Sequence, residues 1–133
     1  MNSSQSSPDQ LAAALLMGVD QDNPAHAAIR LLAAHGKWLR TPAFIRAVGP
    51  MRASTRGGGW ALLDWDSVAV LAAASPASSS ERAILRLACS LAGALPDVLD
   101  DPRSWTLRAM LAPLDGERRD LAVAAITAAS GIG

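Results

Sequence analysis

The amino-acid sequence predicts an all-α fold, a compact bundle of about six helices, on three observations. Apolar residues recur three and four positions apart in several segments, which is the spacing of one helix face. Residues that typically cap helix N-termini precede these segments, and glycine or proline follows most of them. At most a short extended segment is expected, near residues 60–63.

The length of 133 residues is typical of one domain, and a domain of this size buries roughly 65 to 70% of its unfolded surface. We expect a disordered N-terminal leader over residues 1–8 and a single helical domain over residues 9–133. Half of the residues are apolar, but many are alanine, and the chain has one Phe, four Trp and no Tyr. Small side chains allow close helix packing and each contribute little buried area.

Helix boundaries are clearest near the N-terminus. The first helix is expected over about residues 9–17, with Gly18 as its stop. The second begins at Pro24, which suits the first helical position, and Asn23 before it is a typical N-cap. Gly36 can adopt the left-handed conformation that ends such a helix.

A short third helix over residues 42–48 repeats the same pattern. Thr41 is expected to cap it, Pro42 to open it and Gly49 to end it. The apolar residues expected to face inward are Phe44, Ile45 and Val48.

Residues 49–59 form a Gly-rich segment without periodicity. Three consecutive glycines have high backbone entropy, so we expect a mobile loop here. A helix then restarts after residues 60–63, because Asp64 is a typical cap. Leu63 and Val68 are spaced to pack together across that helix start.

The second half of the chain predicts three more helices. Ser78 and Glu81 have the S-x-x-E spacing of a capping box, which begins the expected central core helix. Its apolar stripe is Ile84, Leu85, Ala88, Leu91, Ala92 and Leu95. Two further helices are expected, over 105–111 behind Ser104 and over about 117–130 behind Asp115.

Charge is balanced overall but uneven along the chain. Twelve basic and twelve acidic residues sum to zero, so no global field argues for nucleic acid or membrane. Residues 23–63 nevertheless contain no acid, whereas the segments on both sides are net acidic. The basic residues of this stretch are Arg30, Lys37, Arg40, Arg46, Arg52 and Arg56.

Motifs for catalysis, cofactors or metals are weak. The Gly-rich segment lacks the lysine and the order of a phosphate-binding loop. Asp64 and Asp66 stand two positions apart at a helix start, where capping and the helix dipole account for both. His26 and His35 are nine residues apart, on opposite sides of one helix, so they cannot share a metal ion unaided. We therefore expect no enzyme, no cofactor, no metal and no small-molecule substrate.

His35 and Cys89 each have an ordinary structural interpretation. His35 lies in the last turn of its helix, where the dipole favours a positively charged imidazole. Cys89 lies among apolar residues of the core helix and is expected to be a buried, inert thiol. A lone cysteine, the absence of a signal peptide and apolar runs too short to span a membrane together predict a cytoplasmic protein without a membrane segment.

Three stretches carry a resemblance to known sequences: HGKWLRTPAFIRAV (35–48), WALLDWDSVAVL (60–71) and ASSSERAILRLACSLAG (77–93). They resemble segments of small, uncharacterised Ala/Arg-rich helical proteins of high-GC actinobacteria and their mobile elements. Eleven arginines against one lysine agree with a GC-rich coding sequence. This resemblance implies no assigned activity and transfers no functional residue.

Without a catalytic constellation, the sequence favours a non-enzymatic protein that acts through protein–protein interaction, with a protein partner or as a homodimer. Tryptophan is enriched at interface anchors, and the tryptophans of this chain stand near loops or helix ends. Core filling explains them equally well. The residues expected to bind the partner are Trp38, Arg40, Arg46, Arg52, Arg56 and Trp60.

The alternative is nucleic-acid binding through the basic segment 23–63. Its helix, turn and short helix are similar to a winged helix-turn-helix, with 41–48 as the reading helix and 51–62 as the wing. Against it, the reading helix offers only Arg46, little else in it can hydrogen-bond to base edges, and the net charge is zero.

Overall fold

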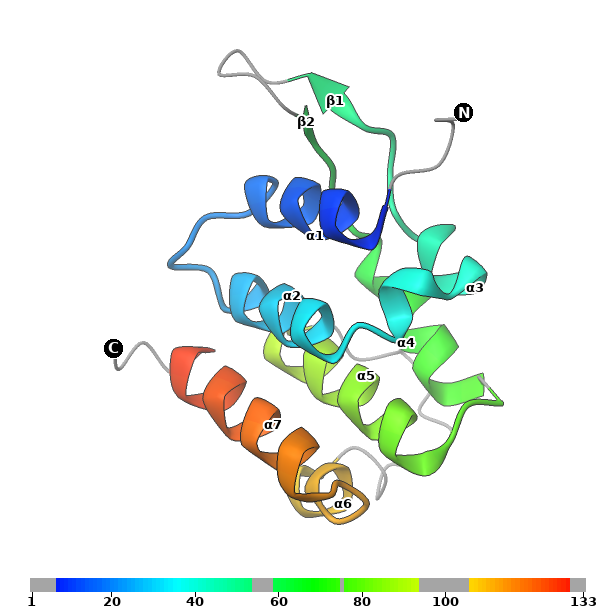
Figure 1. The fold of residues 1–133 in the computed structure, drawn as a ribbon, viewed down its shortest axis with the longest axis vertical. Coiled ribbons are helices and arrows are strands. Elements are labelled where there is room, and N and C mark those ends of the chain that lie inside the picture. The colour runs from blue at the N-terminus through cyan, green and yellow to red at the C-terminus, as the bar shows by residue number, and fades with distance from the viewer. Residues whose placement is uncertain (1–6, 54–58, 75, 94–105, 130–133) are drawn as a thin grey trace.

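The computed structural model describes residues 7–53, 59–74, 76–93 and 106–129 of the chain. This part is mostly helical, so the all-α class is confirmed (Figure 1). Its helices are α1 (Pro8–Met17), α2 (Pro24–His35), α3 (Pro42–Ile45), α4 (Trp65–Ala74), α5 (Ser79–Leu91), α6 (Leu107–Leu111) and α7 (Gly116–Ala129), with a 3-10 turn η1 (Trp38–Arg40). The two short strands are β1 (Arg52–Ala53) and β2 (Gly59–Trp60).

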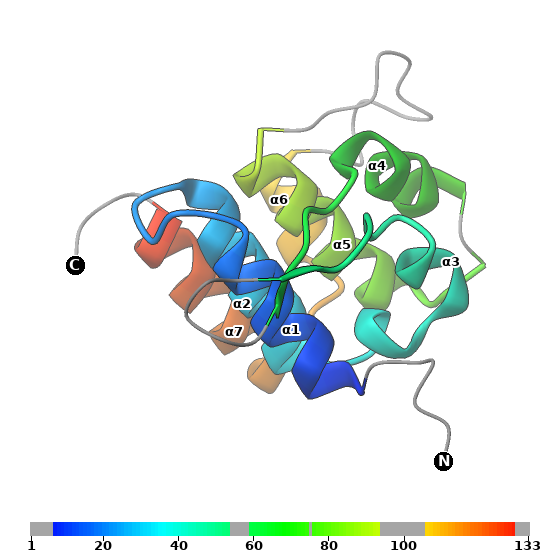
Figure 2. The same ribbon diagram turned by 90° about the horizontal axis from the view of Figure 1, so that it is seen from above.

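The helices are arranged around α5, which contacts α2, α4, α6 and α7. Helices α1 and α7 pack against opposite sides of α2 (Figures 1 and 2). The β1–β2 hairpin lies beyond α1, at the end of the molecule farthest from α6 (Figure 1). The fold is therefore a layered helical bundle with one small hairpin at its edge.

The core is apolar among the described residues. Trp38 and Phe44 are fully buried, and no residue of a charged or polar type is buried with them in the described part of the chain. The expected central helix is confirmed, because α5 contacts four other helices and buries six residues: Ala83, Ile84, Leu85, Leu87, Ala88 and Cys89. The predicted stripe also included Leu95, which lies outside the described residues.

Most of the expected helix caps are present. Asn23 Oδ1 accepts from the Ala25 amide at 2.9 Å, and Gly36 ends α2 with a φ of 83°. Ser78 and Glu81 form the predicted capping box of α5. Asp115 Oδ1 accepts from the Arg118 amide at 3.0 Å at the start of α7. These caps are local in sequence, which is why the sequence identifies them.

The first helix begins earlier than the sequence predicted. Ser7 and Gln10 form a second capping box, and α1 begins at Pro8 rather than at residue 9. Ser7 and Pro8 therefore belong to the helix start and not to the expected leader 1–8, of which residues 1–6 lie outside the described part. Gln10 is as good a partner as glutamate for such a cap.

The third helix is shorter than the predicted 42–48, and its expected cap is wrong. α3 ends at Ile45, because Val48 already pairs with Leu63 across an antiparallel bridge. The Thr41 hydroxyl does not cap α3; it donates to the Lys37 carbonyl at 3.0 Å. Ile45 is also 42% exposed, whereas only the neighbouring Phe44 enters the core.

The start of α6 is also corrected. Thr106 is its cap, with Oγ1 accepting from the Ala109 amide at 3.2 Å, so the helix begins at Leu107 rather than at residue 105. The predicted cap Ser104 lies outside the described residues. α7 spans Gly116–Ala129, one residue from the predicted bounds at each end.

Two short strands form where the sequence predicted a loop over 49–59 and an extended piece over 60–63, and residues 54–58 of that loop lie outside the described residues. β1 and β2 are antiparallel, with Arg52 opposite Trp60 and Ala53 opposite Gly59. At the base of this hairpin, the Gly49 amide donates to Leu62 O at 2.8 Å. Strands of two residues are too short to show alternating polarity. They are defined by their backbone pairing, which the sequence pattern cannot reveal.

The hairpin is attached to the end of α1. The Ala61 amide donates to Ala14 O at 3.1 Å, and this carbonyl also accepts from the Gly18 amide at 3.2 Å. The backbone passes so close to Gly18 that a β-carbon there would meet the carbonyl oxygen of Ala61. Gly18 is thus required by close approach as well as by its position at the helix end.

We expect Gly18→Ala to lower the free energy of unfolding by about 1–3 kcal/mol, because the added methyl overpacks the contact between α1 and the hairpin. Gly116→Ala is the matched control, since a β-carbon at that position meets nothing within 4 Å. It should be neutral or stabilise the protein by up to about 1 kcal/mol. Chemical denaturation of the two variants checks this, and equal stabilities would contradict the close contact.

Candidate functional site

The strongest candidate site is the surface around the hairpin. Arg52 and Trp60 stand opposite each other in the strand pair, and the Arg52 guanidinium lies 5.6 Å from the centroid of the Trp60 ring. Arg52 is exposed and Trp60 is partly buried. This cation–π contact holds a flat aromatic ring and a positive charge together on the outside of the molecule.

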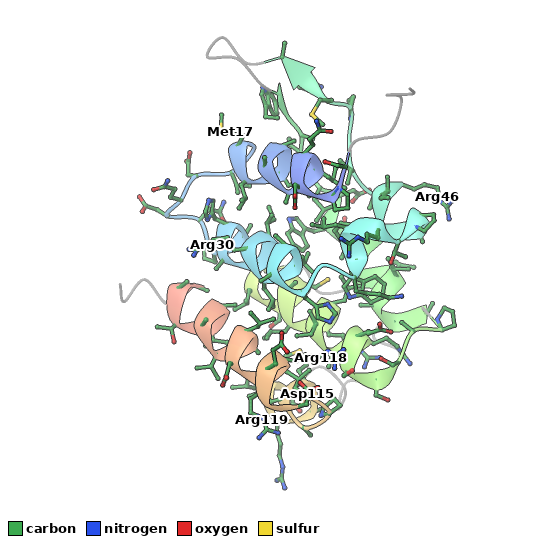
Figure 3. All side chains as sticks on the ribbon, in the orientation of Figure 1. Met17, Arg30, Arg46, Asp115, Arg118 and Arg119 are labelled. Carbon is green, nitrogen blue, oxygen red and sulfur yellow. The ribbon has the colours of Figure 1, made fainter. Side chains whose placement is uncertain are left out.

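Three exposed apolar side chains flank this pair. Met17, Met51 and Leu62 are 56%, 48% and 52% exposed. Met51 lies against Gly59, and Leu62 lies beside Gly18 at the end of α1. Met17 points from α1 toward the side of the hairpin (Figure 3). We call these residues the hairpin surface: Met17, Met51, Arg52, Trp60 and Leu62.

The other residues predicted to bind a partner do not join the hairpin surface. Trp38 is completely buried, and its Nε1 donates to the Glu81 carbonyl at 3.0 Å, so it is a core residue. Arg46, at the end of α3, is exposed on the opposite side of the molecule from Arg30 of α2 (Figure 3). Arg40 is exposed near the end of α2, and Arg56 lies outside the described residues.

A second candidate is a polar cavity of about 430 Å³ between the end of α2 and the start of α7. Charges of both signs line it, so it has no net preference for an anion or a cation. Its charged walls are Lys37, Arg40, Glu81, Asp115, Glu117 and Arg118. His35 also lines the cavity, at the last position of α2.

His35 is held by a residue from the far end of the chain. Its Nε2 accepts from Arg118 Nε at 3.3 Å, and Arg118 in turn donates to Asp115 Oδ2 at 2.9 Å. Partial burial and the Arg118 guanidinium lower the pKa of His35. His35 is the last residue of α2, as expected, but burial and the facing cation oppose the positive imidazole that the helix dipole favours.

Glu81 links this cavity to the core. Its carboxylate accepts from the Ser78 amide at 3.1 Å and lies 3.9 Å from Lys37 Nζ. The hydrogen bond from Ser78 is the main reason why the pKa of Glu81 is below its ordinary value. A carboxylate held in this way caps a helix and is poorly placed to transfer protons.

The remaining candidates for chemistry have structural roles. Asp64 accepts from the Ser67 hydroxyl at 2.8 Å and from its amide at 3.4 Å, which is capping of α4. Within the described residues, no three His, Cys, Asp or Glu side chains lie close enough to hold a metal ion. Cys89 is fully buried in α5, and burial raises the pKa of its thiol to about 12.

Two features of these sites were missed by the sequence analysis. The hairpin register and the contact between His35 and Arg118 join segments whose spacing shows no pattern, the latter across 83 positions. The sequence did contain one signal for the hairpin surface, since Met and Leu residues stand close to an Arg and a Trp. Such residues are typical of interfaces when they are exposed, but the sequence alone does not reveal which apolar residues are exposed.

We expect Cys89 to be unreactive in the folded protein. With a pKa of about 12, only on the order of one thiol in 10⁵ is ionised at pH 7, and the side chain has no access to solvent. A thiol-specific disulfide reagent should label the protein only in denaturant, with the unfolded chain as the positive control. Rapid labelling under native conditions would contradict the burial of Cys89.

Comparison of this chain with protein-family models, with curated proteins and with solved structures finds no match. Among the described helices, none combines the length and the apolar character needed to cross a membrane. The proposal below accordingly depends on the residues of this chain alone.

Proposed function

We propose that the protein is a non-enzymatic binding protein that acts through protein–protein contact, and that the hairpin surface makes this contact. The observation that carries the proposal is the contact of exposed Arg52 with partly buried Trp60, together with three exposed apolar side chains around it. Trp, Met and Arg are the residue types enriched at protein interfaces.

The hairpin surface also has suitable physical properties. Methionine is flexible and polarisable, so Met17 and Met51 can adapt to the shape of a partner. Burial of the exposed apolar area supplies the driving force for binding. Arg52 belongs to a stretch of 41 residues without an acid, 23–63. We infer a partner with an apolar patch and carboxylates at its edge, because such a partner pairs with Arg52.

A folded protein of different sequence fits this surface better than a second copy of the chain. In a symmetric dimer, the same patch is present on both subunits, so two copies of Arg52 approach each other. Like charges at an interface oppose association. A homodimer remains an outcome that sedimentation analysis of the pure protein would reveal.

We expect Trp60→Ala to weaken partner binding by about 2 kcal/mol or more, about thirty-fold in Kd, because it removes the aromatic anchor. Arg52→Glu should weaken binding, because the introduced carboxylate repels the carboxylates of the partner. It should not affect folding, since Arg52 is exposed. The partner is captured from the native cell with wild-type protein, and its affinity for each purified variant is then measured by titration.

Arg30→Glu and Val123→Ser are the matched controls, because both residues are exposed and lie on α2 and α7, away from the hairpin. They should retain wild-type affinity. If both control variants lost affinity as strongly as the hairpin variants, contact through the hairpin surface would be refuted. If Trp60→Ala lowered thermal stability sharply, Arg52→Glu alone would decide.

Several observations weigh against nucleic-acid binding, the alternative function. The expected reading helix is α3, whose four residues span only about 6 Å along a helix axis. Lys37 is paired with Glu81, and Arg30 and Arg46 lie on opposite sides of the molecule (Figure 3). The basic residues of 23–63 that the structure describes therefore do not form one continuous positive face.

We accordingly expect no measurable binding to duplex DNA at about 50 mM salt. Three to five phosphate contacts would instead give a plot of log K against log salt with a slope of roughly −3 to −4.5. Fluorescence anisotropy with labelled duplexes measures this. A slope in that range that Arg52→Glu and Arg46→Glu each reduce by about one would establish the nucleic-acid alternative in place of our proposal.

A further inference from the structure

The seam between α2 and α7 is extensive but is packed through small side chains. Only Ala122 and Ala125 of α7 are buried. An apolar groove of about 370 Å³ and the polar cavity of about 430 Å³ both open along this seam, and Ala34 and Leu121 line both. Small buried side chains supply little hydrophobic free energy, so α7 belongs to the elements that open most easily.

A single side-chain hydrogen bond links the two helices at the polar end of this seam. His35, the last residue of α2, accepts at Nε2 from Arg118 Nε. An imidazole nitrogen accepts only when it carries no proton, so this contact requires neutral His35. A protonated His35 would turn a second N–H donor and a positive charge toward the guanidinium.

Charged groups face His35 from each neighbouring segment. Arg118 and Asp115 come from the start of α7, Glu81 from α5 and Lys37 from the turn after α2. Both carboxylates are already engaged, Glu81 by Ser78 and Lys37, and Asp115 by Arg118. His35 Nδ1 is buried and has no hydrogen-bonding partner among the described residues. Glu81 and Asp115 favour an imidazolium, but partial burial and the Arg118 guanidinium outweigh them, so the pKa of His35 is lowered.

We propose that His35 and Arg118 form a pH-sensitive latch, which holds the first turns of α7 on α2 while the imidazole is neutral and releases them when it is protonated. Release opens the seam and exposes Ala122, which is fully buried in the closed form. The latch is independent of the hairpin surface, which lies on the other side of α2 (Figure 1).

The direction of the pH effect follows from linkage. The pKa of His35 is lowered in the closed form, so the open form binds the proton more tightly. The stabilising contribution is present above the ordinary histidine pKa of about 6.5 and is lost as pH falls from there through the lower pKa of the closed form. Each unit of lowering makes opening tenfold more favourable at acidic pH.

Hydrogen exchange of the α7 amides at pH 7 and pH 5 tests the latch. After correction for the intrinsic exchange rate, we expect α7 protection to fall at pH 5 while α5 protection is unchanged. Nuclear magnetic resonance titration of the His35 ring measures its pKa. The loss of protection should grow with the lowering of that pKa below 6.5, by at most tenfold per unit.

Three variants make the test decisive. His35→Gln keeps an acceptor near the position of Nε2 but does not titrate, so its α7 protection should not change between the two pH values. His26→Gln is the matched control, since it removes the other histidine of α2, and it should behave like wild type. Arg118→Met should raise the measured pKa of His35, because it removes the facing cation.

Equal corrected α7 protection at both pH values in the wild type would overturn the latch. A pH-dependent loss that persisted in His35→Gln would overturn it as well. If His35→Gln failed to fold, the His35 pKa in Arg118→Met would decide, and an unchanged pKa there would refute the contact.

Discussion

The burial of Trp38 is the constraint on which the rest of the structure depends. The largest side chain of the core enters it directly after α2 ends, and its indole N–H must retain a hydrogen bond when it leaves water. The carbonyl of Glu81, in the first turn of α5, accepts that bond. Because Glu81 also closes the capping box of α5, the end of α2 is fixed to the beginning of the central helix.

This anchor explains why the acid-free stretch of the sequence does not become one positive face. With Trp38 directed inward, Lys37 lies beside Glu81, and η1 turns the chain away from the axis of α2. The short α3 then buries Phe44 and leaves Arg46 on the far side of the molecule (Figure 3). Charged residues that are close in the sequence share one surface when a single regular element carries them. Here several turns of the chain separate the basic residues.

The sequence predicted what local physics determines and missed what tertiary contacts determine. The Ser78–Glu81 capping box and the ends of α2 involve residues within a few positions, so composition and spacing identify them. The hairpin depends on backbone pairing between 52–53 and 59–60 and on its contact with α1, and neither leaves a pattern in side chains. The contact of His35 with Arg118 could not be predicted for the same reason, since Arg118 reaches it only in the folded chain.

The two surfaces with functional proposals lie on opposite sides of the same framework. The hairpin is attached to α1, and α7 contacts α2 and α5 (Figure 1). Helices α1, α2 and α5 contribute most of the large buried side chains, whereas α7 contributes two alanines. Opening of α7 would therefore leave the main core and the Trp38 anchor in place, and the change would remain local. A helix held through small side chains, with a titratable contact at its first turns, fits the proposed response to pH without unfolding of the domain that supports the hairpin surface.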